Sequence, residues 1–322
     1  MNFDYSVVIR TLGNTGEKYR CMLDAIERQT VQPAEIIVVI PEGYSLDHRI
    51  GTEQIIRSGK GMVTQRATGI TYAKSDYLLV LDDDLDFPSD FVEQMYHSMQ
   101  KQSLDCVLVS GHWNGTGIES GGNSMPGRLR RLRLAFTGQA FYSRKKSQYY
   151  DVVSSTGGHR TFLNHEEGLC QTGSFACFFI KAKAAKAVDF NEDLWLERGT
   201  ISSYAACDDA VFFYKCFLRG GRIAYTKATD FSHLDAAAGR PAKDRLTEKR
   251  NRLYTLARNR TIFWFRYIWP SRHNLKTLLG GVYGMMNYAV YSTVVNLAPK
   301  NWPAIGALML GYRDALRFVR KK

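Results

Sequence analysis

Short apolar runs alternate with helical stretches over the first hundred residues. The β-branched runs at 5–11, 34–40 and 76–82 have the length and composition of buried strands, and residues 17–29 have the pattern of a helix. Such alternation is typical of a mostly parallel sheet with helices on both faces. We therefore predict an α/β fold, in which ligands bind beyond the carboxyl ends of the strands.

The same pattern returns later in the chain after an interruption. We predict a strand at 105–111, a strand-like run at 172–182, and a helix, a Gly-Gly stop and a strand at 207–225. The stretch between the first two is about sixty residues long, which exceeds ordinary connections and favours a functional or disordered loop. It is rich in Gly, Ser, Arg and Tyr.

The composition changes near residue 241, where Arg, Lys and aromatic residues become dense, so we predict domains at 1–240 and 241–322. The window between Lys276 and Lys300 has no charge and is long enough to span a bilayer. Polar residues lower its hydropathy, however, and its apolar residues fall on one helical side, which favours an amphipathic helix. These residues are Leu275, Leu278, Leu279, Val282, Met286, Val290, Val294 and Leu297. Gly280 and Gly284 form a G-x-x-x-G pair, a motif of packed membrane helices.

The start of this second region carries cations and aromatic rings together. A membrane surface would use the cations for anionic head groups and the rings for the interface. The alternative is that the rings pack on the first domain or form a dimer interface, since exposed aromatics are costly. The residues are Arg258, Arg260, Arg266, Arg272, Phe263, Trp264, Phe265, Tyr267 and Trp269.

The overall charge narrows the range of partners. Lys and Arg outnumber Asp and Glu by 43 to 31, a net charge of +12, which favours phosphorylated substrates, an anionic membrane surface or nucleic acid. No pattern of a nucleic-acid recognition motif occurs, so we expect no nucleic-acid partner. The six cysteines include no C-x-x-C pair, and the N-terminal residues show no signal segment, so we expect a cytoplasmic protein with reduced thiols.

Four aspartates follow one of the predicted strands, in LLVLDDDLDFP at 78–88. Adjacent carboxylates that stay ionised need a cation, and Mg²⁺ or Mn²⁺ held by one or two carboxylates and a substrate's phosphates is the common solution. The alternative is a solvated acidic turn ahead of a helix, with Ser89 or Asp90 as its N-cap.

The order of motifs resembles family 2 glycosyltransferases. The stretches SVVIRTLGN, RQTVQPAEIIVVI and GKGMVTQRATGITYAKSDYLLVLDDD follow one another as in the nucleotide-sugar half of that family, and the resemblance covers residues 5–235. It implies a GT-A fold, which is Rossmann-like, followed here by a C-terminal helical region. It also implies inverting transfer from a nucleotide diphosphate sugar with Mn²⁺ or Mg²⁺.

The resemblance assigns the donor site to several residues of the first half. They are Thr11, Arg66, Asp82, Asp83 and Asp84, with Asp84 and Asp82 as metal ligands. Where the family has an aspartate to receive the nucleobase, this chain has Ile40 and Pro41, and Glu42 is the nearest acid. The D-x-D spacing also fits Asp84 with Asp86, but a strand that ends at Leu81 favours the first choice.

The second half supplies the predicted base. The segment CDDAVFFYKCFLRGGRIAY resembles the family's E-D motif, which makes Asp209 the catalytic base, beside Asp208. The alternative is that both acids only complement a helix dipole. His233 stands where the family often has a histidine near the metal, although a lone histidine is commonly an ordinary surface or core residue. Gly173 stands where the resemblance implies the acceptor floor, or it only punctuates a strand.

The resulting hypothesis is a metal-dependent hexosyltransferase that serves cell-surface polysaccharide biosynthesis at the inner face of the cytoplasmic membrane. Its acceptor is a glycan or a lipid-linked glycan, and Arg128, Arg130, Arg131 and Arg133 are candidate acceptor contacts or a solvated charged face. Homo-oligomers through the C-terminal helices are a further expectation. The alternatives are a haloacid-dehalogenase-like phosphatase, which also places D-x-D after a strand, and an inactive membrane-bound scaffold.

Overall fold

The computed structural model describes residues 3–113, 152–160, 168–234 and 245–321. Within these residues nine strands form one sheet in the order β3-β2-β1-β4-β10-β6-β11-β5, and β9 pairs with β11. The strands of this sheet are β1 (Tyr5–Arg10), β2 (Glu35–Pro41), β3 (Glu53–Ser58), β4 (Tyr77–Leu81), β5 (Leu85–Asp86), β6 (Cys106–Trp113), β9 (Gly168–Cys170), β10 (Cys177–Lys181) and β11 (Ile223–His233). A separate hairpin consists of β7 (Val152–Val153) and β8 (His159–Arg160).

The sheet is mixed and mostly parallel. Strands β1 to β4 pair in parallel, and β6 and β11 run in the same direction on the far side of the antiparallel β10. This arrangement confirms the predicted α/β class. It also places the carboxyl ends of β1 and β4 next to each other, since Ile9 pairs with Leu81.

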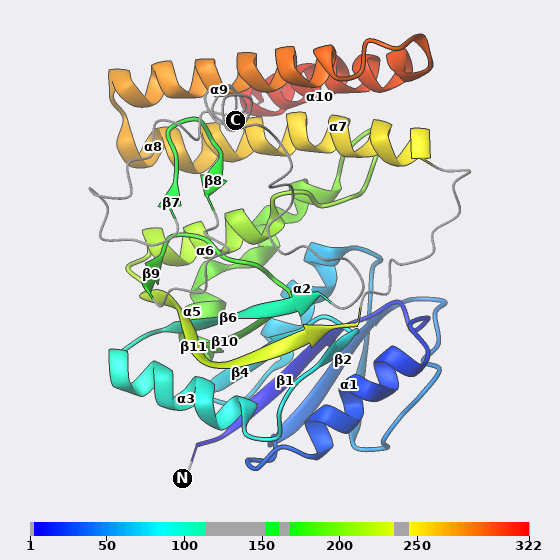
Figure 1. The fold of residues 1–322 in the computed structure, drawn as a ribbon, viewed down its shortest axis with the longest axis vertical. Helices are drawn as coiled ribbons and strands as arrows, with labels where there is room; N and C mark the ends of the chain where they lie inside the picture. Colours follow the sequence, from blue (N-terminus) through cyan, green and yellow to red (C-terminus); the bar gives the residue numbers. More distant parts are fainter. Residues whose placement is uncertain (1–2, 114–151, 161–167, 235–244, 322) are drawn as a thin grey trace, which may run out of the picture.

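Helices cover both faces of the sheet (Figure 1). They are α1 (Glu17–Glu27), α2 (Met62–Tyr72), α3 (Phe91–Gln102), α5 (Ala182–Val188) and α6 (Asp208–Leu218), with the 3₁₀ segment η3 (Phe190–Glu197). Side chains alternate along each strand, so Val7 and Ile9 pack with α1 and α3 while Val8 packs with α2 and α6. The two resulting cores explain why these strands read as continuous apolar runs.

The C-terminal region is helical, as predicted. It consists of α7 (Arg245–Phe263), the π-helical η5 (Trp264–Ile268), α8 (Trp269–Arg272), α9 (Leu275–Val294), η6 (Pro299–Asn301) and α10 (Trp302–Arg320). Helix α7 lies against the rest of the molecule, and α9 and α10 lie on its outer side (Figure 1). Helices α7 and α10 approach closely at Gly311, where a Cβ atom would lie 2.4 Å from the Tyr254 carbonyl oxygen.

The prediction that the basic and aromatic stretch faces a membrane is wrong for three of its residues. Phe263 and Trp264 are 1% and 2% exposed and belong to the core that also contains α2 and α6. Arg258 is buried too, and its guanidinium donates to the Trp195 carbonyl oxygen at 2.8 Å. For these side chains the alternative, packing on the first domain, is correct. The sequence could not decide between the two, because hydrophobic periodicity does not reveal which surface an apolar side contacts.

Helix α9 has an unusual orientation. Seven of the eight apolar residues predicted for one side of the helix lie in α9, Leu297 follows its end, and all eight are exposed. The small residues Gly281 and Gly284 face the protein. A Cβ atom on Gly281 would lie 2.2 Å from the Trp264 ring. One on Gly280 would lie 2.3 Å from Ser155 Oγ, and one on Gly284 would lie 2.3 Å from the Thr156 carbonyl oxygen. The G-x-x-x-G pair therefore lets α9 pack against its own chain. Among the helices that the structure describes, none combines the length and hydropathy needed to cross a bilayer.

Candidate active site

The aspartates at 82–84 emerge where β4 ends, beside the end of β1. Because the two strands are parallel neighbours, Arg10 and Thr11 leave the sheet at the same edge. Each of the three carboxylates has a different partner from another element.

Asp82 is held by two arginines. Its Oδ1 lies 2.8 Å from Arg66 Nη2 and 3.0 Å from Arg10 Nη2. Arg66 comes from α2, is 2% exposed, and stacks on the ring of Phe175 at 4.3 Å. Its other terminal nitrogen lies 2.8 Å from Asp208 Oδ2. Arg66 thus joins the two acidic motifs that the sequence places far apart.

Asp83 is bound by hydroxyl groups. Its Oδ2 accepts hydrogen bonds from Thr11 Oγ1 at 2.5 Å and from Thr15 Oγ1 at 3.3 Å. Burial raises the pKa of Asp83, and the Thr11 hydrogen bond opposes this shift. Thr11 Oγ1 also accepts from the Gly13 backbone N–H at 2.8 Å, which fixes the loop after β1.

Asp84 lies beside His233. The two residues are 6% and 9% exposed, and Asp84 Oδ1 is 3.5 Å from His233 Nε2. They come together because β5 and β11 pair at Leu85 and His233, and because the Leu234 N–H donates to the Asp84 carbonyl oxygen at 2.8 Å. Asp86 points elsewhere and forms an ion pair with Arg28. The strand ends at Leu81, as the preferred D-x-D choice required.

Asp208 and Asp209 begin α6. Asp208 is 8% exposed and Asp209 is half-buried, and Asp209 Oδ1 accepts from the Ala210 N–H at 2.7 Å. Burial raises the pKa of both carboxyl groups, with Arg66 opposing the shift. The preceding residue, Cys207, has a φ of 70°, a left-handed conformation that sets the direction in which the helix leaves the loop.

Two predicted residues have other surroundings. Glu42 follows β2 at the same edge of the sheet, and its side chain is exposed. Gly173 lies against Leu108 of β6, where a Cβ atom would be 2.3 Å from Leu108 Cδ1, so a larger residue there would displace this side chain. Arg128, Arg130, Arg131 and Arg133 lie outside the described residues.

The sequence interpretation missed residues that support the site. Gln65 donates from Nε2 to the carbonyl oxygens of Thr11 and Val39, both at 2.8 Å, and so ties α2 to the ends of β1 and β2. Glu197 caps the helix that carries Arg66, because its carboxylate accepts from the backbone N–H groups of Val63 and Thr64 at 2.9 and 3.2 Å. Position 65 adjoins the predicted Arg66, but no local signal links Glu197 to α2.

The geometry combines three capacities at one edge of the sheet. Asp84 and His233 offer oxygen and nitrogen ligands, Arg10 and Arg66 offer positive charge, and Asp209 offers a carboxylate with a raised pKa. Within the described residues no group of three or more His, Cys, Asp or Glu side chains converges as a metal site. A cation here would take its remaining ligands from a bound molecule or from water.

One family of known proteins matches part of this chain. Residues 51–165 match the model of the family described as glycosyl transferase family 2, which confirms the resemblance noted in the sequence. The matched part contains Arg66 and all three aspartates at 82–84. No curated protein gives a significant sequence match.

Solved structures show weaker similarity. GalNAc-T7, solved with UDP, GalNAc and Mn²⁺, is 13% identical with a TM-score of 0.48, and the match covers 88% of this chain and 55% of that one. TarS of S. aureus, residues 1–349, solved in complex with UDP-GlcNAc, is 14% identical with a TM-score of 0.45, over 99% of this chain and 92% of that one. This chain thus spans about half the length of GalNAc-T7.

Proposed function

We propose that this chain, a family 2 glycosyltransferase by the match over residues 51–165, is an inverting enzyme that transfers a sugar from a nucleotide diphosphate sugar to a glycan or lipid-linked acceptor. One observation carries the proposal. Arg66, almost fully buried, bonds both Asp82 after β4 and Asp208 at the start of α6. The donor motif and the base motif therefore share one edge of the sheet.

The donor is held by residues from the ends of three strands. Thr11 and Asp83 form one hydrogen-bonded unit after β1 and β4, which suits the hydroxyl groups of a nucleoside. Arg66 and Arg10 supply positive charge near the diphosphate. Glu42 is the proposed contact for the nucleobase of the donor, because it follows β2 at the same edge of the sheet.

A divalent cation, Mn²⁺ or Mg²⁺, fits beside Asp84 and His233. A carboxylate oxygen and an imidazole nitrogen 3.5 Å apart can both be ligands, and the donor's phosphates would complete the set. Asp82 is assigned with them by sequence, but its Oδ1 is already shared by two arginines. When bound, the cation neutralises charge on the departing diphosphate.

Asp209 acts as the general base. Its carboxylate accepts the proton of the acceptor hydroxyl while that oxygen bonds to the anomeric carbon, and the bond from this carbon to the diphosphate oxygen breaks. The diphosphate leaves with the electron pair, so charge is conserved. Asp208 positions this end of α6 through its ion pair with Arg66.

The outer side of α9 supports association with a membrane from the cytoplasmic side, in polysaccharide biosynthesis. Leu279, Met286 and Val290 are 60%, 63% and 51% exposed, and such apolar surface is unusual in a protein without a partner. Lys276 and Lys300 at the two ends of the uncharged window are exposed and suit anionic head groups. A homo-oligomer formed through the same side is the competing proposal.

Donor binding tests the enzymatic proposal. The purified full chain is titrated with a panel of nucleotide sugars, with Mn²⁺ or with a chelator, and slow hydrolysis of the donor is followed. One preferred donor, bound more tightly with metal, is the expected result. Absence of binding to every nucleotide sugar, with a folded protein, would refute it.

Vesicle cosedimentation tests the membrane proposal. Anionic vesicles should bind the wild-type chain in a salt-sensitive manner, and Leu279→Glu with Met286→Glu should abolish this binding. The matched control is Leu218→Glu, an exposed leucine at the end of α6. Concentration-dependent dimers that the double variant dissolves, without vesicle binding, would favour the oligomer instead.

A further inference from the structure

Tyr204 is an exposed aromatic residue close to the proposed base. Its side chain is 52% exposed, and it lies in the loop between η3 and α6, shortly before Asp209. Among the described residues up to Leu234, the other exposed large hydrophobic side chains are Tyr72 and Leu218. These two end α2 and α6, which lead into β4 and β11 at the opposite edge of the sheet. Tyr204 is therefore the exposed member at the edge that carries the aspartates.

The loop holds Tyr204 between buried neighbours. The Tyr204 backbone N–H donates to Ser202 Oγ at 3.1 Å, and Ser202 is buried. Ala205 and Ala206, which follow Tyr204, are buried as well. The Asp208 N–H donates to the Ala205 carbonyl oxygen at 3.2 Å, so the residue after Tyr204 already belongs to the turn that begins α6. The backbone that presents the ring is thus part of the packed protein.

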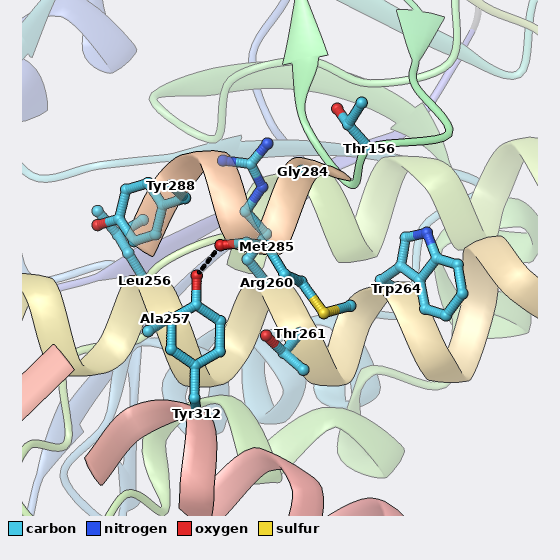
Figure 2. Close-up of a pocket in the computed structure, with 10 residues that line it drawn as sticks. All are labelled: Thr156, Leu256, Ala257, Arg260, Thr261, Trp264, Gly284, Met285, Tyr288 and Tyr312. Atoms are coloured by element: carbon cyan, nitrogen blue, oxygen red, sulfur yellow. Dashed lines mark hydrogen bonds between the residues drawn. The ribbon is translucent and has the colours of Figure 1, made fainter. Parts of the chain in front are cut away.

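Helix α7 of the C-terminal region anchors the same loop. Asn259, fully buried, donates from Nδ2 to the carbonyl oxygens of Leu196 and Ala206 at 2.7 and 3.1 Å, and so joins the two ends of the loop. Helices α9 and α10 pack against α7, and Figure 2 shows Tyr312 of α10 donating to the Met285 carbonyl oxygen of α9 at 2.8 Å. A ring on such a preorganised loop loses little entropy when a ligand binds.

Charged groups of the active site lie near the Tyr204 hydroxyl. Burial raises the pKa of Tyr204, the negative charges of Asp208 and Asp209 raise it further, and the positive charge of Arg252 on α7 opposes the shift. Asp208 is the carboxylate that bonds Arg66 at 2.8 Å. The side chain is therefore surrounded by protein near its hydroxyl, while half of its surface stays open to solvent.

A half-exposed tyrosine ring in this place suits a sugar. A pyranose presents a face of C–H groups that packs on the electron-rich face of an aromatic ring, while its hydroxyl groups remain free to form hydrogen bonds. A protein partner would need a broader apolar patch, but the exposed neighbour Ser203 is polar. The acceptor hydroxyl must come within hydrogen-bond reach of Asp209, so the acceptor is the substrate expected beside Tyr204.

We propose that Tyr204 packs on a sugar ring of the acceptor and so positions the acceptor hydroxyl for Asp209. The group that receives the new sugar is then itself a saccharide, and not a lipid alcohol or a hydroxyl-bearing side chain of a protein. The assignment to the acceptor rests on the proposed glycosyltransferase function, whereas the contact with a sugar rests on the exposure and surroundings of Tyr204.

Saturation-transfer NMR with methyl glycosides tests the sugar contact in the full chain. The panel consists of methyl glucoside, galactoside, mannoside and N-acetylglucosaminide. At least one should bind the wild-type chain, and Tyr204→Ala should weaken that binding by about three- to tenfold, as expected for loss of one stacked ring. Tyr204→Phe retains the ring and should bind the glycoside like wild type. Tyr72→Ala is the matched control, because Tyr72 is 51% exposed at the end of α2 and should leave binding unchanged.

Equal glycoside binding by wild type and Tyr204→Ala would overturn the proposal, as would absence of binding by wild type. Transfer kinetics then test the assignment to the acceptor. The glycoside that binds should accept a sugar from the preferred donor, and Tyr204→Ala should raise its KM by the same factor without changing donor affinity. A bound glycoside that accepts no sugar, or a loss of donor affinity in Tyr204→Ala, would contradict this assignment. Absence of donor binding in wild type contradicts the enzymatic proposal, while glycoside binding that depends on Tyr204 would still stand.

Discussion

Two buried polar clusters in this molecule differ in how completely they are satisfied. The Arg66 cluster consists of Arg10, Arg66, Asp82 and Asp208, and the Asp193 cluster consists of Asp193, Trp195, Lys215 and Tyr267. In the second, Asp193 accepts from Trp195 Nε1 at 2.8 Å, Tyr267 Oη at 2.5 Å and Lys215 Nζ at 2.6 Å. Lys215 Nζ uses its other donors on Asp189 and Glu192.

The Arg66 cluster leaves capacity unused. Both arginines share one oxygen of Asp82, and the Nε atoms of Arg10 and Arg66 are buried without partners among the described residues. Burial, together with the charge of Arg10, lowers the pKa of Arg66. A complete network specifies packing, whereas an incomplete one retains charge for a ligand. The Asp193 cluster thus joins η3, α6 and η5, and we propose that the Arg66 cluster binds the donor.

Replacement of the central basic residue should distinguish the roles of the two clusters most clearly. Arg66→Met and Lys215→Met each leave a buried carboxylate without its ion pair, which costs about 3–5 kcal/mol of unfolding free energy. Only Arg66→Met should also abolish donor binding. Denaturant unfolding and calorimetry, below the midpoint of both variants, provide the measurement. Donor binding that survives in folded Arg66→Met would contradict the proposed division.

The base should be separable from the cluster beside it. Asp209→Asn keeps the shape but accepts no proton, so transfer should fall by ~10²-fold or more while donor affinity persists. Steady-state transfer rates and donor titrations are compared with those of Asp193→Asn, which should lose stability instead. A near wild-type transfer rate in Asp209→Asn would show that another group is the general base.

Loss of the proposed metal ligand should affect donor binding rather than packing. Asp84→Asn removes a charged divalent-cation ligand beside His233, so donor affinity with Mn²⁺ should fall by at least the roughly 10–100-fold typical of losing an outer-shell partner at a metal site. Affinity measured with a chelator should change little. Asp86→Asn is the matched control, because that carboxylate pairs with Arg28 instead. Equal losses in both variants would argue against a specific metal role.

The strand ends show how far sequence reasoning reaches. Local runs predicted β1 and β4, and a family motif predicted Asp82 to Asp84 with Asp208 and Asp209, because these signals lie within short stretches of sequence. Glu197 and Asp193 were not predicted, since their partners on α2, α6 and η5 come from distant segments. The membrane-facing prediction for Phe263 and Trp264 was wrong for the same reason, because the sequence pattern shows an apolar side but not the surface that covers it.

Acidity should affect activity and stability in opposite ways at the Asp208 and Asp209 pair. Burial raises both pKa values, so the base is lost as pH falls through a value above the usual range for aspartate. Between the unfolded and the folded pKa the native state binds more protons, so the free energy of unfolding falls as pH rises. The acid limb of the transfer profile and urea unfolding against pH test both signs. Asp208→Asn should reduce the slope of unfolding free energy against pH, and an unchanged slope would contradict the shift.

The smallest effect should come from one hydroxyl of the complete network. Tyr267→Phe removes the donor from Tyr267 Oη to Asp193 Oδ1, while Trp195 Nε1 still donates to that oxygen and Lys215 to the other. The loss should cost about 0.5–1.5 kcal/mol of unfolding free energy. Transfer rate and donor affinity should be unchanged, because the cluster holds η5 on α6 and not the donor. Urea unfolding gives the first quantity and steady-state kinetics the second. A folded Tyr267→Phe variant with impaired transfer would show that the two clusters are coupled through α6, which carries Asp208 at its start and Lys215 two turns later.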